Sequence, residues 1–216
     1  MPDIAAVLFD LGGVIFSSPF DAFADYERSI GAPVGTIRII NSTNPDDNAW
    51  AKLERSDVTD EEFCALFEAE AIAHLGPEIG ERFSARAVLS TIGGAVRPQM
   101  VEAVRRCKQH FAVAALTNNV RSHGAGSHSK RPDVVAALGE FHHVVESSVV
   151  GVRKPEPAFY LAACELLGVL PDQCVFLDDL GINLKPAKAM GMRTIKVIDP
   201  DVALAELEAI VQIPLR

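Results

Sequence analysis

Four separated stretches of this 216-residue sequence carry side chains that could bind and attack a charged ligand. In chain order they are Asp10, Thr117-Asn118-Asn119, Lys154 and Asp178-Asp179. A carboxylate can attack phosphorus or carbon, and paired carboxylates offer the hard oxygen ligands that Mg²⁺ prefers. Taken singly, each stretch has a commoner structural explanation as a turn residue, a helix cap or a surface lysine. The combination is what indicates chemistry on an anionic ligand.

Three of these stretches stand at the ends of apolar runs with the length and composition of strands. The runs cover residues 5–9, 111–116 and 174–177. A short apolar run bounded by polar residues or glycine is typical of a strand buried on both faces, as in a parallel sheet. Ligands collect outside the carboxyl ends of strands in open α/β sheets, so Asp10 is expected to face a crevice.

Helical patterns alternate with strands in the second half of the chain, which predicts a doubly wound parallel sheet of the α/β class. Pro98 is well placed to open a helix, and Gly168 to end one. The predicted helices cover 98–107, 132–138, 155–167, 183–190 and 201–211, and further strands are predicted at 142–145 and 193–198.

Residues 17–88 have a different character, because charged and apolar residues mix there at helical spacing without a clear strand. Thr59 followed by three acidic residues predicts a helix start, and Gly76-Pro77 predicts the end of that helix. We therefore expect an α/β core made of residues 1–16 and 89–216, with a small helical unit of residues 17–88 inserted after the first strand.

Aspartate, threonine–asparagine, lysine and paired aspartates, in this order and context, resemble the four motifs of the haloacid dehalogenase-like (HAD) hydrolase superfamily. The closer resemblance is to the phosphatase-like domain of soluble epoxide hydrolase and to its relatives fused to acyl-CoA dehydrogenases. It rests on Phe9-Asp10-Leu11, Val150-Gly151, Lys154-Pro155-Glu156-Pro157 and Phe176-Leu177-Asp178-Asp179-Leu180-Gly181. The resemblance implies a Rossmann-like core, with residues 17–88 as a cap over the active site.

The family pattern implies that Asp10 is the nucleophile and forms an aspartyl-phosphate. It also implies that Asp10, the main-chain carbonyl of Gly12 and Asp179 bind Mg²⁺. Adjacent residues of a strand point in opposite directions, so Asp178 is expected nearby or as a further ligand.

Lys154 is implied as the residue that neutralises charge between the nucleophile and the incoming phosphate. Thr117 and Asn118 are implied as phosphate-binding residues, and Asn119 follows them in the same motif. Asn183 is expected either to orient the acidic loop or to cap a helix.

Glycine at position 12 departs from the pattern of HAD phosphatases, which have a second aspartate two residues after the nucleophile. That aspartate protonates the leaving group and then activates water, and a general acid–base of this kind contributes roughly 10²–10⁴-fold to the rate. The motifs supply no other obvious acid. His123 and His128 follow the second motif and could approach the site, although solvent-facing loop positions are the simpler interpretation.

Three functions therefore remain open. The first is a Mg²⁺-dependent phosphatase acting on a small phosphomonoester, with slow turnover if Gly12 limits it. The second is a metal-independent 2-haloacid dehalogenase, which neither Gly12 nor the acidic pair favours. The third is a degenerate family member that binds a phosphorylated ligand or partner without turnover.

Composition limits the remaining possibilities. The formal net charge of −9 disfavours non-specific nucleic-acid binding, which needs a cationic surface. No apolar run reaches the about 18 residues of a membrane span, and the four cysteines lack close pairing motifs, so we expect a protein of the reducing cytoplasm. The expected partner is a small phosphorylated molecule, and the choice between monomer and homodimer stays open.

Overall fold

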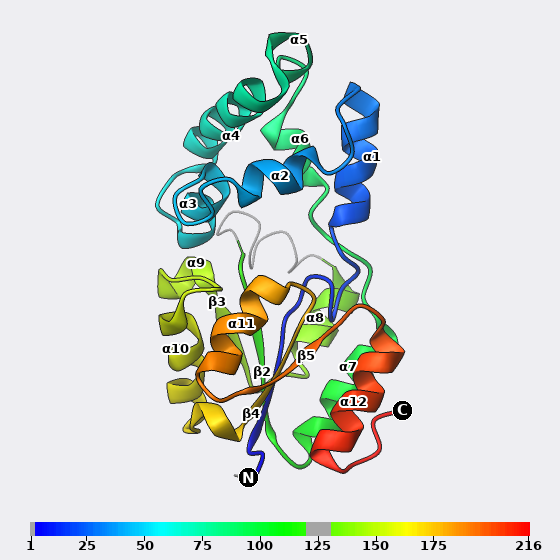
Figure 1. The fold of residues 1–216 in the computed structure, drawn as a ribbon. Coiled ribbons are helices and arrows are strands. Elements are labelled where there is room, and N and C mark those ends of the chain that lie inside the picture. Colours follow the sequence, from blue (N-terminus) through cyan, green and yellow to red (C-terminus); the bar gives the residue numbers. More distant parts are fainter. Residues whose placement is uncertain (1–2, 120–130) are drawn as a thin grey trace.

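The computed structural model describes residues 3–119 and 131–216 of the chain. Within them, a five-stranded parallel sheet has the strand order β3-β2-β1-β4-β5 (Figure 1). The strands are β1 (Ala6–Phe9), β2 (Ala112–Thr117), β3 (His143–Glu146), β4 (Cys174–Asp178) and β5 (Arg193–Lys196). The predicted α/β fold is confirmed, and the strand that carries Asp10 occupies the centre of the sheet.

Helices cover both faces of the sheet, as a doubly wound fold requires. On β1, Val7 and Phe9 pack into the core beneath one face, whereas Ala6 and Leu8 pack into the core beneath the other. The first face is covered by α7 (Pro98–Lys108), α8 (Pro132–Leu138) and α12 (Pro200–Val211), and the second by α10 (Pro157–Leu167) and α11 (Gly181–Ala189).

Two details near the third motif differ from the prediction. The helix expected from residue 155 begins at Pro157, so Lys154 lies in a loop before the helix. The four-residue helix α9 (Ser147–Val150) was not predicted, because a single turn has too little periodicity to detect. A short 3₁₀ helix, Pro171–Gln173, precedes β4.

The segment between β1 and α7 is helical, as predicted, and lies above the carboxyl edge of the sheet (Figure 1). Its helices, called the cap helices below, are α1 (Phe20–Ile30), α2 (Thr36–Ser42), α3 (Ala49–Arg55), α4 (Asp60–Leu75), α5 (Pro77–Gly80) and α6 (Ala85–Ser90). Thr59 and Glu62 form a capping box at the start of α4, and Gly76 ends this helix, both at the predicted positions.

The cap helices have a hydrophobic core of their own, separate from the two cores of the sheet. Its centre is aromatic: the Trp50 ring packs edge-on against Phe63 and Phe67, and Phe67 packs edge-on against Phe83. Because these helices bury their apolar faces mainly against one another, we propose that residues 17–88 form a cap unit, which α6 continues to Ser90.

Two chain segments that connect the cap helices to the core run side by side. The amide of Ser17 donates to the carbonyl of Ala95 at 2.8 Å, and the amide of Ala95 donates to the Ser17 hydroxyl at 3.0 Å. A Cβ at Gly94 would lie 2.3 Å from the carbonyl oxygen of Ser17, so only glycine allows the two segments to approach this closely. This paired connection fixes one side of the cap relative to the sheet.

Across the described residues, no helix combines the length and apolarity needed to cross a membrane.

Candidate active site

Asp10 and Lys154 meet above the centre of the sheet, although they are far apart in sequence. The Lys154 ammonium lies 2.7 Å from Asp10 Oδ1 and 2.8 Å from Asp178 Oδ2. Lys154 is only 1% exposed and Asp10 only 7%, so the ion pairs are screened little by water. Asp10 is held by its strand, where its amide donates to Leu177 at 2.9 Å.

Asp178 is fully buried and holds the site together. Besides Lys154, it accepts hydrogen bonds from the amide of Leu180 at 2.8 Å and from Asn183 Nδ2 at 3.0 and 3.1 Å. The carbonyl of Asn183 in turn accepts from the Tyr160 hydroxyl at 2.7 Å. Asn183 therefore orients the acidic loop, one of the two roles expected for it.

Asp179 lies beside Gly13, which has a positive φ of 78°. A Cβ at Gly13 would come within 2.2 Å of Asp179 Oδ2, so residue 13 must be glycine for Asp179 to occupy this place. The carbonyl of Gly13 accepts a hydrogen bond from Arg97 Nη1 at 2.6 Å. Arg97 thus fastens the loop that follows Asp10, a role that no local motif in the sequence indicates.

Three carboxylates converge at this point, and their charges exceed the nearby positive charge. Oxygens of Asp10, Asp178 and Asp179 all lie within 4.8 Å of one another. Burial raises the pKa of Asp10, Lys154 opposes this shift, and the two other aspartates add to it. Burial and the adjacent Asp178 raise the pKa of Asp179 to about 6. The pKa of Lys154 is raised because Asp10 and Asp178 outweigh the effect of its burial.

An oxygen-rich group of this kind fits a divalent cation. When all three carboxylates are ionised, they exceed the charge of the Lys154 ammonium by two negative charges, which one Mg²⁺ would balance. Asp178 is already engaged by Lys154, Leu180 and Asn183, so Asp10 and Asp179 are the carboxylates better placed to bind the ion.

Gly12 has open space beside it. Apart from Gly12 itself and its two chain neighbours, no described residue has an atom within 4 Å of a Cβ built at this position, and the φ of Gly12 is not in the left-handed region. The backbone of residue 12 is therefore compatible with an ordinary side chain. His123 and His128, considered as alternative acids, lie outside the described residues.

In the second motif, the side-chain amide of Asn118 is engaged by the protein itself. The Asn118 side chain pairs with the backbone of Lys154: Oδ1 accepts from the Lys154 amide at 2.8 Å, and Nδ2 donates to its carbonyl at 2.9 Å. Asn118 thereby holds the lysine loop in place. Thr117 ends β2 as a nearly buried residue, with its hydroxyl 3.4 Å from the carbonyl of Asn118.

Asn119 forms its hydrogen bonds with residues at the start of α9. Its Nδ2 donates to Glu146, and its Oδ1 accepts from the Ser148 hydroxyl at 2.9 Å. Its amide donates to the Ser147 hydroxyl at 3.0 Å. These contacts make Asn119 a scaffold for the loop, and only the tertiary structure reveals them.

Comparison with known proteins gives this geometry a family context. Residues 4–191 match the family model of haloacid dehalogenase-like hydrolases. The chain belongs to this HAD hydrolase family.

Several curated relatives align with nearly the whole chain. The mouse acyl-CoA dehydrogenase family member 10 is 33% identical over 98% of this chain but only 19% of its own length. The bifunctional epoxide hydrolase 2 of Sus scrofa is 28% identical over 98% of this chain and 40% of its own length. The chain thus spans less than half of these relatives. Phosphatase MT3486 of Mycobacterium tuberculosis is 32% identical over 88% of this chain and 85% of its own length.

Solved structures share the fold. A HAD-family enzyme of Bacteroides thetaiotaomicron, crystallised with magnesium and inorganic phosphate, superposes with a TM-score of 0.60 over 89% of this chain and 93% of its own, at 21% identity. The L-2-haloacid dehalogenase of Xanthobacter autotrophicus superposes with a TM-score of 0.58 over 95% of this chain and 82% of its own, also at 21% identity. The predicted family and fold are confirmed.

Proposed function

We propose that this HAD hydrolase is a Mg²⁺-dependent phosphatase that acts on a small phosphomonoester through an aspartyl-phosphate on Asp10. The observation that carries the proposal is the meeting of Asp10, Lys154 and the aspartate pair at one buried point. A relative of nearly equal length, phosphatase MT3486, supports the same reaction class.

The chemistry follows from the charges of these residues. A carboxylate oxygen of Asp10 attacks the phosphorus, the bond to the ester oxygen breaks, and the leaving alkoxide takes its proton from solvent water, because residue 12 supplies no acid. Lys154 lowers the repulsion between the Asp10 carboxylate and the phosphate, which are both anions. Water then attacks the aspartyl-phosphate, releases phosphate and restores Asp10.

Mg²⁺, held by Asp10, the Gly12 carbonyl and Asp179 with Asp178 beside them, would supply charge neutralisation of the transferred phosphoryl group. Thr117 and the backbone of Asn118 are the proposed phosphate-binding groups. The Asn118 side chain has a second part, because it holds the backbone of Lys154.

The test is hydrolysis of p-nitrophenyl phosphate by purified protein with Mg²⁺ and with EDTA. We expect Asp10→Asn to abolish hydrolysis, because an amide is a far weaker nucleophile, and EDTA to suppress the wild-type rate. Glu165→Gln, which changes an exposed acid on α10, is the matched control and should retain full activity. Equal rates for Asp10→Asn and wild type would remove Asp10 from the mechanism.

Gly12 favours a second candidate function, a phosphate-binding protein without turnover, because the usual acid–base is missing. Binding of inorganic phosphate in the presence of Mg²⁺, combined with no hydrolysis across a panel of phosphorylated metabolites, would support it. Release of halide from a 2-haloacid in EDTA would instead support the dehalogenase alternative.

The four cysteines are free thiols in the structure, and we propose a cytoplasmic protein, either monomeric or homodimeric, with a small phosphorylated substrate.

A further inference from the structure

The loop that carries Lys154 forms two ion pairs with the last residues of α3. Arg153 Nε lies 2.5 Å from Glu54 Oε2, and Arg55 Nη1 lies 3.4 Å from Glu156 Oε1. Glu54 and Arg55 are consecutive residues of the cap, and each pairs with a residue of opposite charge in the core loop. These two ion pairs, called the cap latch below, flank Lys154 on either side.

The Glu54–Arg153 pair is the more buried part of the latch. The two side chains are 10% and 14% exposed, so the pair is less screened than an ion pair on the surface. Arg153 belongs to the core by sequence, yet the contacts of its guanidinium are with the cap: besides Glu54, it donates to the carbonyl of Pro45 at 3.0 Å.

Glu54 connects the latch to the hydrophobic core of the cap. Its Oε1 accepts from the indole of Trp50 at 2.9 Å, and Trp50 packs against the aromatic centre of the cap. Its main-chain carbonyl accepts from the Ser147 hydroxyl of α9 at 2.7 Å. A movement of α3 would therefore be transmitted directly to the residue before Lys154.

Lys154 is restrained from both directions. Below it, the Asn118 side chain holds its backbone, and Asp10 and Asp178 hold its ammonium. Above it, Arg153 is tied to Glu54. We propose that Glu54 is a positioning residue, which acts through Arg153 to hold Lys154 against Asp10 when the cap helices sit over the sheet. The kinetic part of this inference rests on the proposed phosphatase function.

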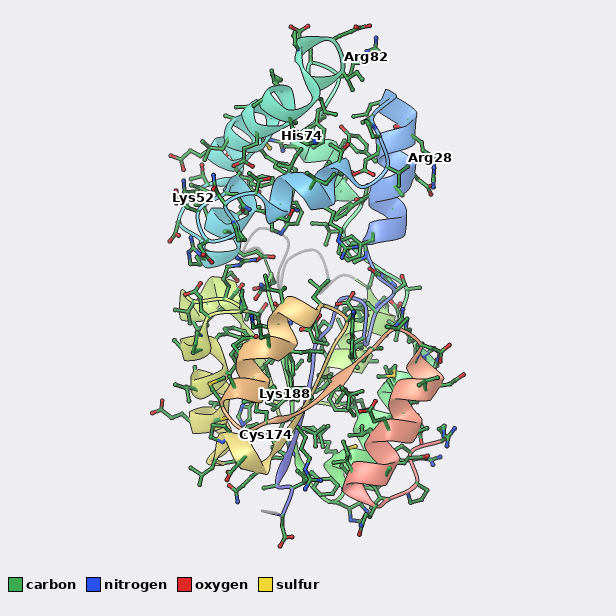
Figure 2. The ribbon with its side chains drawn as sticks, in the orientation of Figure 1. Arg28, Lys52, His74, Arg82, Cys174 and Lys188 are labelled. Atoms are coloured by element: carbon green, nitrogen blue, oxygen red, sulfur yellow. The ribbon has the colours of Figure 1, made fainter. Side chains whose placement is uncertain are left out.

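The first experiment requires no turnover. The folded protein is acetylated with dilute acetic anhydride, and the rate at Lys154 is measured by mass spectrometry relative to Lys188, an exposed lysine on α11 that Figure 2 labels. In wild type, we expect Lys154 to be strongly protected because it is 1% exposed. Glu54→Gln should raise the relative rate at Lys154 about tenfold or more, because Arg153 loses its buried partner.

The matched control is Glu27→Gln. Glu27 is also a buried cap glutamate, 1% exposed, but it accepts from the amides of Gly35 and Ile37 at 2.6 and 2.7 Å, within the cap. This variant should lower the melting temperature and leave the protection of Lys154 unchanged. Equal loss of protection in both variants would reduce Glu54 to a merely structural residue and overturn the proposal.

Kinetics with p-nitrophenyl phosphate provide a second readout. Glu54→Gln should lower kcat about tenfold with little change in KM, because Lys154 acts on charge that develops in the transition state. The double variant Glu54→Gln/Arg153→Gln should be no slower than either single variant, as expected for two residues that act through one contact. Additive losses, or an unchanged kcat, would contradict the proposal.

If Glu54→Gln does not fold, Arg153→Lys tests whether the Glu54–Arg153 pair positions Lys154. Lysine keeps the charge but reaches fewer acceptors, so its effects should have the same direction and be smaller. Unchanged protection of Lys154 in the folded Arg153→Lys variant would overturn the inference. Absence of hydrolysis by wild type would count against the proposed function alone, because the labelling comparison does not depend on turnover.

Discussion

At the scale of single residues, the site brings together Asp10, Lys154 and the aspartate pair, the groups on which the proposed phosphatase reaction depends, but it has no acid at position 12. Residue 12 is glycine, and its surroundings among the described residues leave room for a side chain. Gly13 is different, because a Cβ there would overlap Asp179. The surroundings of residue 13 therefore require glycine and those of residue 12 do not, so only Gly12 can be replaced without moving the acidic loop.

We expect Gly12→Asp to raise the rate of p-nitrophenyl phosphate hydrolysis by about 10²-fold, the lower end of what a positioned general acid–base contributes. The p-nitrophenolate leaves without a proton, so the gain would come from activation of the water that attacks the aspartyl-phosphate. The measurement is kcat at saturating substrate and Mg²⁺. Gly12→Asn has the same shape without the acid and should give no gain. An equal rise in both variants would show that residue 12 acts by shape rather than by proton transfer.

The sequence indicated Asp10, Lys154 and the aspartate pair because each stands in a recognisable local context. It could not indicate that the Asn118 side chain holds the lysine loop or that Arg97 fastens the loop after Asp10. Those contacts join segments 36 and 84 residues apart, and no local pattern encodes them. The candidate residues themselves were thus predictable, whereas the long-range contacts that hold their loops in place were not.

At the scale of elements, the cap helices hold together through an aromatic core that does not extend into the sheet. Phe67 is fully buried and contacts the rings of Trp50, Phe63 and Phe83. The start and the end of α4 were predictable from Thr59 and Gly76, but the packing of one helix on another was not. The four-residue α9, which meets α3, had no detectable signal.

Phe67→Ala should destabilise the cap helices by about 3–5 kcal/mol, because it leaves a large cavity in their core. Hydrogen exchange followed by mass spectrometry is expected to show faster exchange in α3 and α4, with little change in β1 and β4. Leu66→Ala, at a position that is 40% exposed, is the neighbouring control and should have little effect. Faster exchange throughout the sheet would contradict the independence of the two cores.

At the scale of the whole molecule, the fold brings three carboxylates together at the expense of mutual repulsion. The α/β class and the strand pattern could be predicted because apolar runs and helical segments alternate plainly. The place of the cap over the carboxyl edge could not be derived from periodicity, because it depends on the paired connection at Ser17 and Ala95 and on the latch at Glu54.

Mg²⁺ should raise the melting temperature of the wild-type protein, because the ion binds the folded carboxylate cluster and not the unfolded chain. At about 100 times the dissociation constant, the gain is about 2.7 kcal/mol. Thermal unfolding with Mg²⁺ or EDTA tests this. Asp179→Asn should abolish the shift, whereas Glu165→Gln should retain it. An undiminished shift in Asp179→Asn would place the ion elsewhere.

The central position of β1 has a consequence for how the molecule is made. β1 lies between β2 and β4, yet the ribosome delivers β2 only after about a hundred further residues and β4 later still. On a nascent chain, β1 therefore has neither of its partner strands while the intervening helices are synthesised. Asp10 is therefore translated well before Lys154 and Asp178, the residues that complete its surroundings.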